Sequence, residues 1–469
     1  MTRQEAAIQY LESNYLQFNR LRYDVVGGKL QIRDLNDQWR EMTKQEINSV
    51  VCDCAQELQI NVSVREIMTV LQSNLVPSVH PLREYINGLR AYEPGHPDWI
   101  DWVASQVKVR DSALDNGRGN AAMGRSQSEL LDGTKCLLDN APHCEASHSP
   151  QSGRPIGGTP SYSPNGASSG SNADALWRVC FKKWFVGMVA GWMYDDVVNH
   201  QVLVLIGKQG IFKTTWLERL IPPQLRAYCC KLANTTQINK DDRLRLAEFG
   251  LINMDELDSM SARELNTMKS IITASDVNER AAYGYTKERR IRLASFCASS
   301  NRREFLTDIT GNRRWLPFEV ESIQNPFHTQ LPYENLYAQA VYLVEHGYNY
   351  WFDLEDIDQL EKHNETFRAQ ESEEQLLPIL FDVPAEGLGE FMTTAQISER
   401  LVTYGNIKRP MPLNRLGMLL GQMGFSAVQR SINGLRGRGW LVYQRNSDEI
   451  NSLKRLLGAA QLHSCTADS

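Results

Sequence analysis

One stretch of the chain decides the fold: Val202-Leu203-Val204-Leu205-Ile206-Gly207-Lys208-Gln209-Gly210-Ile211-Phe212-Lys213-Thr214. It begins with an unbroken apolar run, which is typical of a strand buried on both faces of a parallel sheet. A glycine-rich turn follows, and then a lysine and a threonine. Such a turn directs backbone N–H groups toward an anion, and the helix after it adds the positive end of its dipole. The stretch therefore predicts a strand, a phosphate-binding loop and a helix.

The residues expected to contact a bound nucleotide are Gly207, Gln209, Gly210, Ile211, Phe212, Lys213, Thr214 and Thr215. We expect Lys213 to lie against the β- and γ-phosphates and Thr214 to hold Mg²⁺. The usual pattern has glycine immediately before the lysine, and here that residue is Phe212. A residue in a strained backbone conformation costs about 1–3 kcal/mol. Either the loop takes another route with Phe212 packed beneath it, or the nucleotide binds weakly.

A second apolar run, Leu251-Ile252-Asn253-Met254, ends in Asp255 and Glu256. At the end of a buried strand, Asp255 can coordinate Mg²⁺ directly or through water, and Glu256 can orient and deprotonate an attacking water. Taken alone, the pattern also describes a strand that meets a solvated loop. Its place after the glycine-rich loop, within alternating strands and helices, favours the catalytic interpretation.

A third apolar run, from Leu293 to Ser299, is followed by Asn301. Ligands of α/β sheets lie beyond the carboxyl ends of the strands, so Asn301 would face the γ-phosphate. The alternative is an asparagine that caps a helix. Two arginines, Arg313 and Arg314, precede the next predicted strand. They could stabilise transition-state charge across a subunit interface, or form an ion pair or a DNA-phosphate contact.

A basic segment with two tyrosines lies between the second and third runs. Basic groups bind phosphates and aromatic rings stack on bases, so the segment could be a hairpin that grips single-stranded DNA, although a solvated charge run has the same composition. Its candidate DNA-binding residues are Arg280, Tyr283, Lys287, Arg289 and Arg290.

The composition of the 469 residues, 42% apolar and 23% charged, is that of a globular protein with several cores. The net charge of −6 gives no overall attraction to nucleic acid, so DNA contacts must come from local basic patches. The apolar stretch Phe185–Met193 is too short to span a bilayer, and the first residues lack a signal-peptide pattern. We expect a cytoplasmic protein with no membrane partner.

The nine cysteines are irregularly spaced and suit a reducing compartment. The cluster Cys136, His143, Cys144 and His148 fits no common zinc spacing and is interpreted as part of a solvated linker.

Composition and periodicity also predict domain boundaries. The expected segments are a small α+β domain (1–75), a helical lead-in (76–110), a low-complexity flexible insertion (111–172), a P-loop NTPase domain of α/β class (173–350), a helical connector (351–388), a winged-helix DNA-binding domain (389–447) and a tail (448–469). Within the winged helix, residues 434–443 predict a basic, glycine-rich wing between two strands, with Arg436 and Arg438 as DNA contacts.

The order of these motifs resembles the virulence-associated protein E family. The resemblance rests on Lys240-Asp241-Asp242, Asp255-Glu256-Leu257, Met268–Thr273, Arg280, Tyr283-Gly284, Ser300-Asn301, Phe305-Leu306 and Thr310-Gly311-Asn312-Arg313-Arg314-Trp315. The family comprises P-loop proteins of phages, plasmids and genomic islands, and it is similar to superfamily 3 helicases and AAA+ replication initiators. One string is altered here, because Thr286 stands where the family has an arginine soon after Tyr283-Gly284.

The resemblance implies an AAA+-like core that assembles into a hexameric ring. ATP and Mg²⁺ would bind between subunits, with Lys213, Thr214, Asp255, Glu256 and Asn301 on one side and an arginine of the neighbour on the other. Hairpins around Lys287 would line a channel for one DNA strand, and the winged helix would grip duplex DNA.

Two functions follow from these expectations. The first is an ATP-driven DNA translocase or helicase that starts replication of a mobile element. The second, motivated by Phe212 and the wing arginines, is a nucleotide-gated DNA-binding initiator or regulator with little or no hydrolysis. The Asp-Glu pair and Asn301 argue against a small-molecule kinase. Residues 1–75 show no primase metal site, so a primase would be a separate protein.

Overall fold

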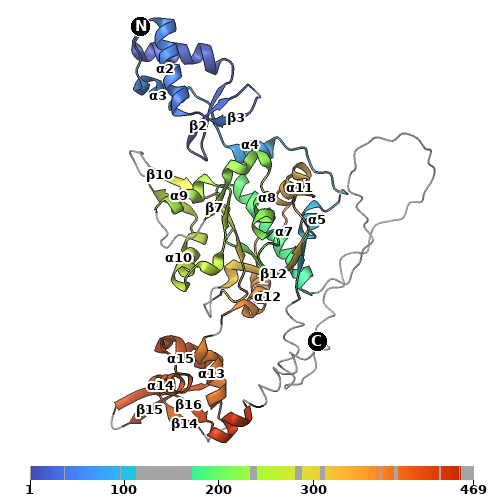
Figure 1. Cartoon of the computed structure of the whole chain (residues 1–469), viewed down its shortest axis with the longest axis vertical. Helices are drawn as coiled ribbons and strands as arrows, with labels where there is room; N and C mark the ends of the chain where they lie inside the picture. Colours follow the sequence, from blue (N-terminus) through green and yellow to red (C-terminus); the bar gives the residue numbers. More distant parts are fainter. Residues whose placement is uncertain are drawn as a thin grey trace, which may run out of the picture. The chain divides into compact units, whose positions relative to one another are not determined.

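The computed structural model describes residues 2–35, 37–95, 97–111, 172–232, 240–279, 288–306, 312–369, 371–384, 389–432, 435–453 and 455. The chain divides into two compact units, Met1–Asp111 with Ser169–Arg368, and Ser112–Ser168 with Ala369–Ser469 (Figure 1). The predicted insertion and the cysteine–histidine cluster lie outside the described residues, as does most of the tail. Within the described ranges, every helix is too short or too polar to cross a membrane.

A six-stranded sheet forms the centre of the first unit. Its strands, in spatial order, are β5 (Val107–Val109), β12 (Trp315–Ile323), β6 (Val202–Ile206), β11 (Ser295–Ser300), β8 (Leu251–Met254) and β7 (Cys229–Leu232). All neighbours pair in parallel except β5, which is antiparallel to β12. The predicted α/β class with a parallel-rich sheet is confirmed. The sheet is mixed rather than purely parallel, because the short edge strand β5 runs antiparallel to β12. The sequence did not predict this strand.

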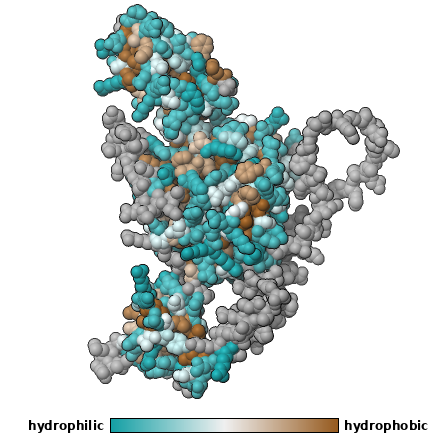
Figure 2. Space-filling model, viewed as in Figure 1, coloured by the Kyte–Doolittle hydropathy of each residue, from teal (hydrophilic) through white to brown (hydrophobic). Residues whose placement is uncertain are grey.

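The central strand β6 is buried on both faces because helices cover both sides of the sheet. Leu203 and Leu205 pack in one cluster with α5 (Trp99–Ala104), α7 (Asn172–Met193), α8 (Lys213–Arg219) and α11 (Tyr333–Glu345). Val202, Val204 and Ile206 point to the other face and pack in a second cluster with α9 (Lys240–Glu248) and α10 (Ala262–Ile272). The face drawn in Figure 2 is mainly hydrophilic, with apolar residues in small separate patches.

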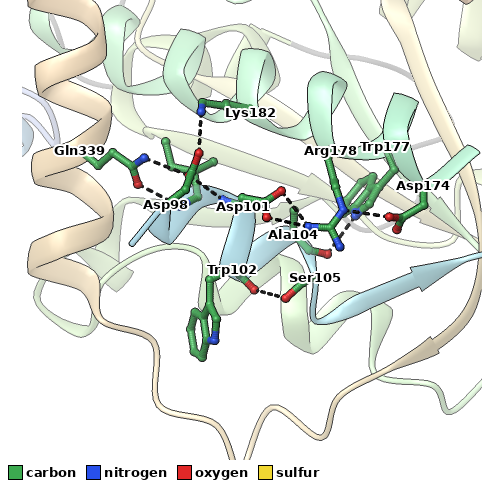
Figure 3. A network of polar contacts seen from close by, with 11 residues as sticks. Asp98, Asp101, Trp102, Ala104, Ser105, Asp174, Trp177, Arg178, Lys182 and Gln339 are labelled. Atoms are coloured by element: carbon green, nitrogen blue, oxygen red, sulfur yellow. Dashed lines mark hydrogen bonds and ion pairs between the residues drawn. The ribbon is translucent and has the colours of Figure 1, made fainter. Parts of the chain in front are cut away.

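Polar contacts fix the helices of the first cluster to one another (Figure 3). Arg178 of α7 donates from Nη1 to both carboxylate oxygens of Asp101 at 2.7 Å. Asp98, which caps α5, accepts from Lys182 Nζ at 2.7 Å and from Gln339 of α11 at 2.9 Å. These contacts hold α5, α7 and α11 together although they lie far apart in the sequence.

The first unit also contains a small N-terminal sheet with the strand order β3-β2-β1-β4. Its elements are α1 (Arg3–Leu11), η1 (Glu12–Leu16), β1 (Leu21–Asp24), β2 (Lys29–Arg33), β3 (Trp39–Glu41), α2 (Lys44–Leu58), α3 (Val64–Leu71) and β4 (Ser78–Val79). β1 and β2 form an antiparallel hairpin around Gly27-Gly28. Both α2 and α3 begin at capping boxes, at Thr43 and Ser63.

The remaining elements of this unit are α4 (Pro81–Asn87), η2 (Pro223–Tyr228), η3 (Leu257–Ser259), β9 (Asp276–Glu279), β10 (Glu288–Ile291), η4 (Asn312–Arg314), α12 (Leu354–Asn364) and η5 (Glu365–Phe367).

The second unit is built on the long strand β16, which pairs with three other strands. Its elements are α13 (Ser372–Leu380), β13 (Phe381–Asp382), β14 (Glu390–Met392), α14 (Thr394–Gly405), α15 (Leu413–Gln422), β15 (Ser426–Ile432) and β16 (Leu435–Gln444). Helices α14 and α15 lie within the segment predicted as a winged helix. The prediction of a wing between two strands at residues 434–443 is wrong, because β16 itself occupies residues 435–444.

The physical reason lies in the pairing of β16. It bonds to β15 along its first residues and buries Trp440 and Val442 further on. A Cβ at Gly439 would lie 2.6 Å from Met392 O, so this glycine permits close approach of β14. Gly439 therefore serves packing within a strand.

A buried guanidinium, that of Arg292, links segments near the amino ends of the main parallel strands. Arg292 is 1% exposed. Within the described residues its guanidinium donates to backbone carbonyls, those of Asn199, Ile271, Ile272, Ala274 and Ala294. These carbonyls come from the end of α10 and from the segments before β6 and β11, so one side chain connects three parts of the fold.

We expect Arg292→Met to lower the free energy of unfolding by at least about 3 kcal/mol, because several buried carbonyls lose their donors. Thermal or urea unfolding measures the change. The matched control is Arg289→Met, since the Arg289 side chain is 78% exposed in an ion pair with Asp276 and should change stability by less than about 0.5 kcal/mol. Equal midpoints for the two variants would contradict a structural role for Arg292.

Candidate functional site

The loop between β6 and α8 has a backbone that suits glycine. Gly207 and Gly210 have φ values of 157° and 88°, and Phe212 has φ 67° and ψ 17°. Phe212 thus adopts the left-handed conformation that glycine takes without strain. Of the two alternatives left open for Phe212, a ring packed beneath the loop is not what the structure shows. The side chain is 36% exposed, and its ring meets that of Phe327 edge-on, with centroids 6.2 Å apart.

Lys213, the first residue of α8, is turned back onto the loop. Its Nζ donates to Gly207 O and Lys208 O, each at 2.7 Å, and to Asn301 Oδ1 at 3.2 Å. The residue is 6% exposed, and burial lowers the pKa of its ammonium against the opposing effects of Asp258 and Asp255. Among the described residues, the hydrogen bonds of this ammonium all go to neutral oxygens, so an anion bound at the loop would be attracted by its positive charge.

Thr214, Ser299 and Lys231 converge on Asp255. Asp255 Oδ1 accepts from Thr214 Oγ1 at 2.8 Å and from Ser299 Oγ at 2.5 Å, and Oδ2 pairs with Lys231 Nζ at 2.5 Å. Burial acts to raise the pKa of Asp255, but the bonds from Lys231, Ser299 and Thr214 outweigh it and hold the pKa below its usual range. The carboxylate is therefore ionised and lies beside two hydroxyls.

These oxygens suit Mg²⁺, which commonly uses one or two carboxylates together with waters and phosphates. In the described part of the chain no group of three or more His, Cys, Asp or Glu could hold a metal ion. A cation at Asp255 would therefore depend on Thr214 and on a phosphate ligand.

Glu256 and Asn301 stand at the same edge of the sheet. Glu256 is exposed and has φ 55° and ψ 52°, a strained conformation of the kind that clusters at functional sites. Asp258 accepts from the backbone N–H of Asn301 at 3.1 Å and so positions the residue whose side chain contacts Lys213. The structure thus brings Lys213, Thr214, Asp255 and Asn301 together, as predicted.

Arg313 and Arg314 lie at the other end of the parallel strands, where β6 and β12 begin. Trp315 pairs with Val202 at the start of β6, while Glu319 pairs with Ile206 at its end. The arginines just before Trp315 are therefore separated from the loop by the length of β6, about 16 Å at ~3.3 Å per residue. Backbone register places them too far to act in the site of their own chain.

Several predicted DNA contacts are described only in part. Arg289 and Arg290 lie on β10, where Arg289 pairs with Asp276 at 2.5 Å and Arg290 with Glu248 at 3.4 Å. Arg438 is exposed on β16 opposite Gln429. The remaining predicted contacts, Arg280, Tyr283, Lys287 and the side chain of Arg436, fall outside the described part.

Sequence reasoning missed Lys231, Ser299 and Asp258. Lys231 reaches Asp255 because β7 pairs with β8, and no pattern in the short segment Cys229–Leu232 predicted that strand. Ser299 did carry a signal, since it is a hydroxyl residue at the end of an apolar strand beside Asn301. Asp258 follows the predicted acidic pair closely and could have been included with it.

The family model of the virulence-associated protein E-like domain matches residues 167–369. The match confirms, for residues 167–369, the resemblance indicated by the motifs. The matched range contains β6 to β12 and every residue of the loop. A comparison with curated proteins gives no match.

Two solved structures are similar along most of the chain. The apo structure of the NrS-1 C terminal region (305-718) has 12% identity and a TM-score of 0.41, covering 93% of this chain and 99% of that chain. The A form apo structure of the NrS-1 C terminal region has 10% identity and a TM-score of 0.38, covering 91% and 98%. The likeness is weak in both cases, and the family match is what identifies this part of the chain.

We expect Gly207→Ala to destabilise the loop, because its Cβ would lie 2.8 Å from Val320 O, a backbone atom that cannot turn aside. The cost should be about 1–3 kcal/mol in thermal unfolding. Gly210→Ala is the matched control, since it also has positive φ but its Cβ would meet nothing within 4 Å. Equal shifts for both variants would show that the loop adjusts freely around Gly207.

Proposed function

We propose that this chain binds Mg²⁺ and ATP on the loop 207–214 and uses ATP hydrolysis to move along DNA, in replication initiation of a mobile element. The single observation that carries the proposal is the convergence of Lys213, Thr214, Asp255 and Asn301 at one edge of the sheet. A lysine, a hydroxyl, a carboxylate and an amide in this arrangement match the needs of phosphoryl transfer to water.

The strand order supports an AAA+-like P-loop core. β11 lies between β6 and β8, so its polar end stands between the loop and the acidic pair. Asn301 can therefore face the same γ-phosphate that Lys213 contacts, and Asp255 lies beside Thr214. The loop, the acidic pair and Asn301 thus follow three neighbouring parallel strands.

In the proposed reaction, Lys213 exchanges its carbonyl partners for phosphate oxygens. Thr214 and Asp255 would hold Mg²⁺, which supplies positive charge to the β- and γ-phosphates when bound. Glu256 would take the proton of the attacking water, and Asn301 would orient that water. Lys231 would release Asp255 as the cation binds.

Arg313 and Arg314 are assigned to the site of a neighbouring copy. Their place at the far edge of the sheet excludes their own site and suits an arginine supplied across a subunit interface. This supports the proposal of a ring, with a hexamer implied by the family resemblance.

DNA contacts are proposed at two places. The hairpin of β9 and β10, with residues 280–290, would hold single-stranded DNA. The second unit, with helices α14 and α15 and the hairpin of β15 and β16, would act as a winged helix on duplex DNA through Arg438 and Arg436. A separate primase would then supply primers.

Steady-state ATP hydrolysis with and without single-stranded DNA tests the main proposal. We expect DNA-stimulated turnover in the wild type, and a loss of at least about 100-fold in kcat in Lys213→Ala and Glu256→Gln. Glu361→Gln, an exposed acid on α12, is the control and should retain full turnover. Turnover that persists in Lys213→Ala would contradict the assignment of the loop.

A second function, nucleotide-gated DNA binding without hydrolysis, is favoured by the strained Phe212. In that case the wild type shows no turnover, and Phe212→Gly gains it because the loop relaxes around phosphate.

For either function we expect Arg438→Ala to weaken duplex binding uniformly across sequences and to reduce the salt slope by about one, since a phosphate contact is lost. Fluorescence anisotropy at several salt concentrations measures both. Lys362→Ala, exposed on α12, serves as a control. Unchanged affinity in Arg438→Ala would argue against DNA binding by this hairpin.

A further inference from the structure

Two exposed phenylalanines stand at the entrance to the phosphate-binding loop. Phe212 is 36% exposed and Phe327 is 69% exposed, and their rings meet at 81° with centroids 6.2 Å apart. Exposed aromatic rings are costly to hydrate, and a pair of them beside a polar site suits a flat apolar ligand.

The backbone conformation of Phe212 is one that favours glycine. Glycine would take its left-handed conformation without strain, and the helix after it would begin at the same place. A loop that used only its backbone would gain nothing from the benzyl group. The ring itself is therefore the feature that needs an explanation.

Phe327 is held in place by its own loop. Its N–H donates to Asn325 Oδ1 at 3.0 Å. Farther along this loop, Thr329 O accepts from Arg219 Nη2 at 3.0 Å, and Tyr333 Oη donates to Arg219 O at 2.7 Å. The loop after β12 is thus fastened to the end of α8, so the ring of Phe327 has a fixed position beside the helix.

A cavity of about 400 Å³ connects this ring to the acidic side of the site. Its lining includes Phe327, Thr215, Lys231, Arg219 and Arg226. Thr215 directly follows Thr214, and Lys231 pairs with Asp255. The cavity is at the small end of the range for ligand pockets and has room for one nucleoside. Its cations outnumber its one carboxylate, Glu218, which favours an anionic ligand.

We infer that Phe327, supported edge-on by Phe212, is the stacking surface for the base of the nucleotide, and that the nucleoside occupies this cavity. The inference rests on the proposed function, because Lys213 and Thr214 place the phosphates. Every base has a flat face, so the pair would distinguish nucleotides from bare polyphosphate without choosing among bases.

The test compares binding of ATP and of inorganic triphosphate, both with Mg²⁺, to the full chain by isothermal titration calorimetry. In Phe327→Ala we expect ATP to bind about tenfold more weakly, the effect of losing one stacked aromatic, and inorganic triphosphate to bind as in the wild type. Phe18→Ala is the matched control, since Phe18 is 61% exposed in the N-terminal part of the chain.

A second variant separates the loss of the stacking ring from a distortion of the loop that carries Phe327. Phe212→Gly removes the ring that meets Phe327 edge-on and should also lose affinity for ATP relative to triphosphate. If Phe327→Ala binds ATP like the wild type, or loses ATP and triphosphate equally, the stacking surface is overturned while the proposed function stands. If the wild type binds neither ligand, the proposed function fails and the inference fails with it.

Discussion

The pairing of β6 on both edges, and its burial on both faces, is the constraint on which the rest of the structure depends. A polar side chain on such a strand is costly unless a partner within the protein satisfies it, and β6 carries only apolar side chains. Its polar neighbours must therefore lie beyond its ends. Since β8 and β11 run parallel to it, their ends meet at the same edge, and the loop, Asp255 and Asn301 are brought together.

Both the lysine of the loop and the carboxylate of the site have partners within the chain. Lys213 is surrounded by carbonyl and amide oxygens, and Lys231 neutralises Asp255. Partly buried charges are tolerated only when they have such partners. A phosphate and a divalent cation would replace these contacts with stronger ones of the same sign, so binding need not create an unpaired charge.

Phe212 is where local preference and global fold disagree. Such conflicts are expected at functional sites, where the surrounding structure holds a residue in a conformation that it would not choose. The sequence identified the residue as unusual, and its alternatives left the route of the loop open. The structure retains a glycine-like backbone and turns the ring outward to Phe327, which no spacing in the sequence connects to it.

The sequence by itself determined the α/β class, the main parallel strands, the resemblance of residues 167–369 to the virulence-associated protein E family, and the loop, acidic and asparagine residues that the structure brings together. Those features depend on local patterns, namely apolar runs, glycine-rich turns and the polar residues directly after them. The tertiary structure alone decided the strand order, the edge strands β5 and β7, the contact of Lys231 with Asp255, and the place of Arg313 and Arg314 at the far edge. It also decided that residues 435–444, predicted as a wing, form strand β16. Each of these depends on which distant segments pair, and pairing is set by the packing of the whole sheet, which a short stretch of sequence does not encode.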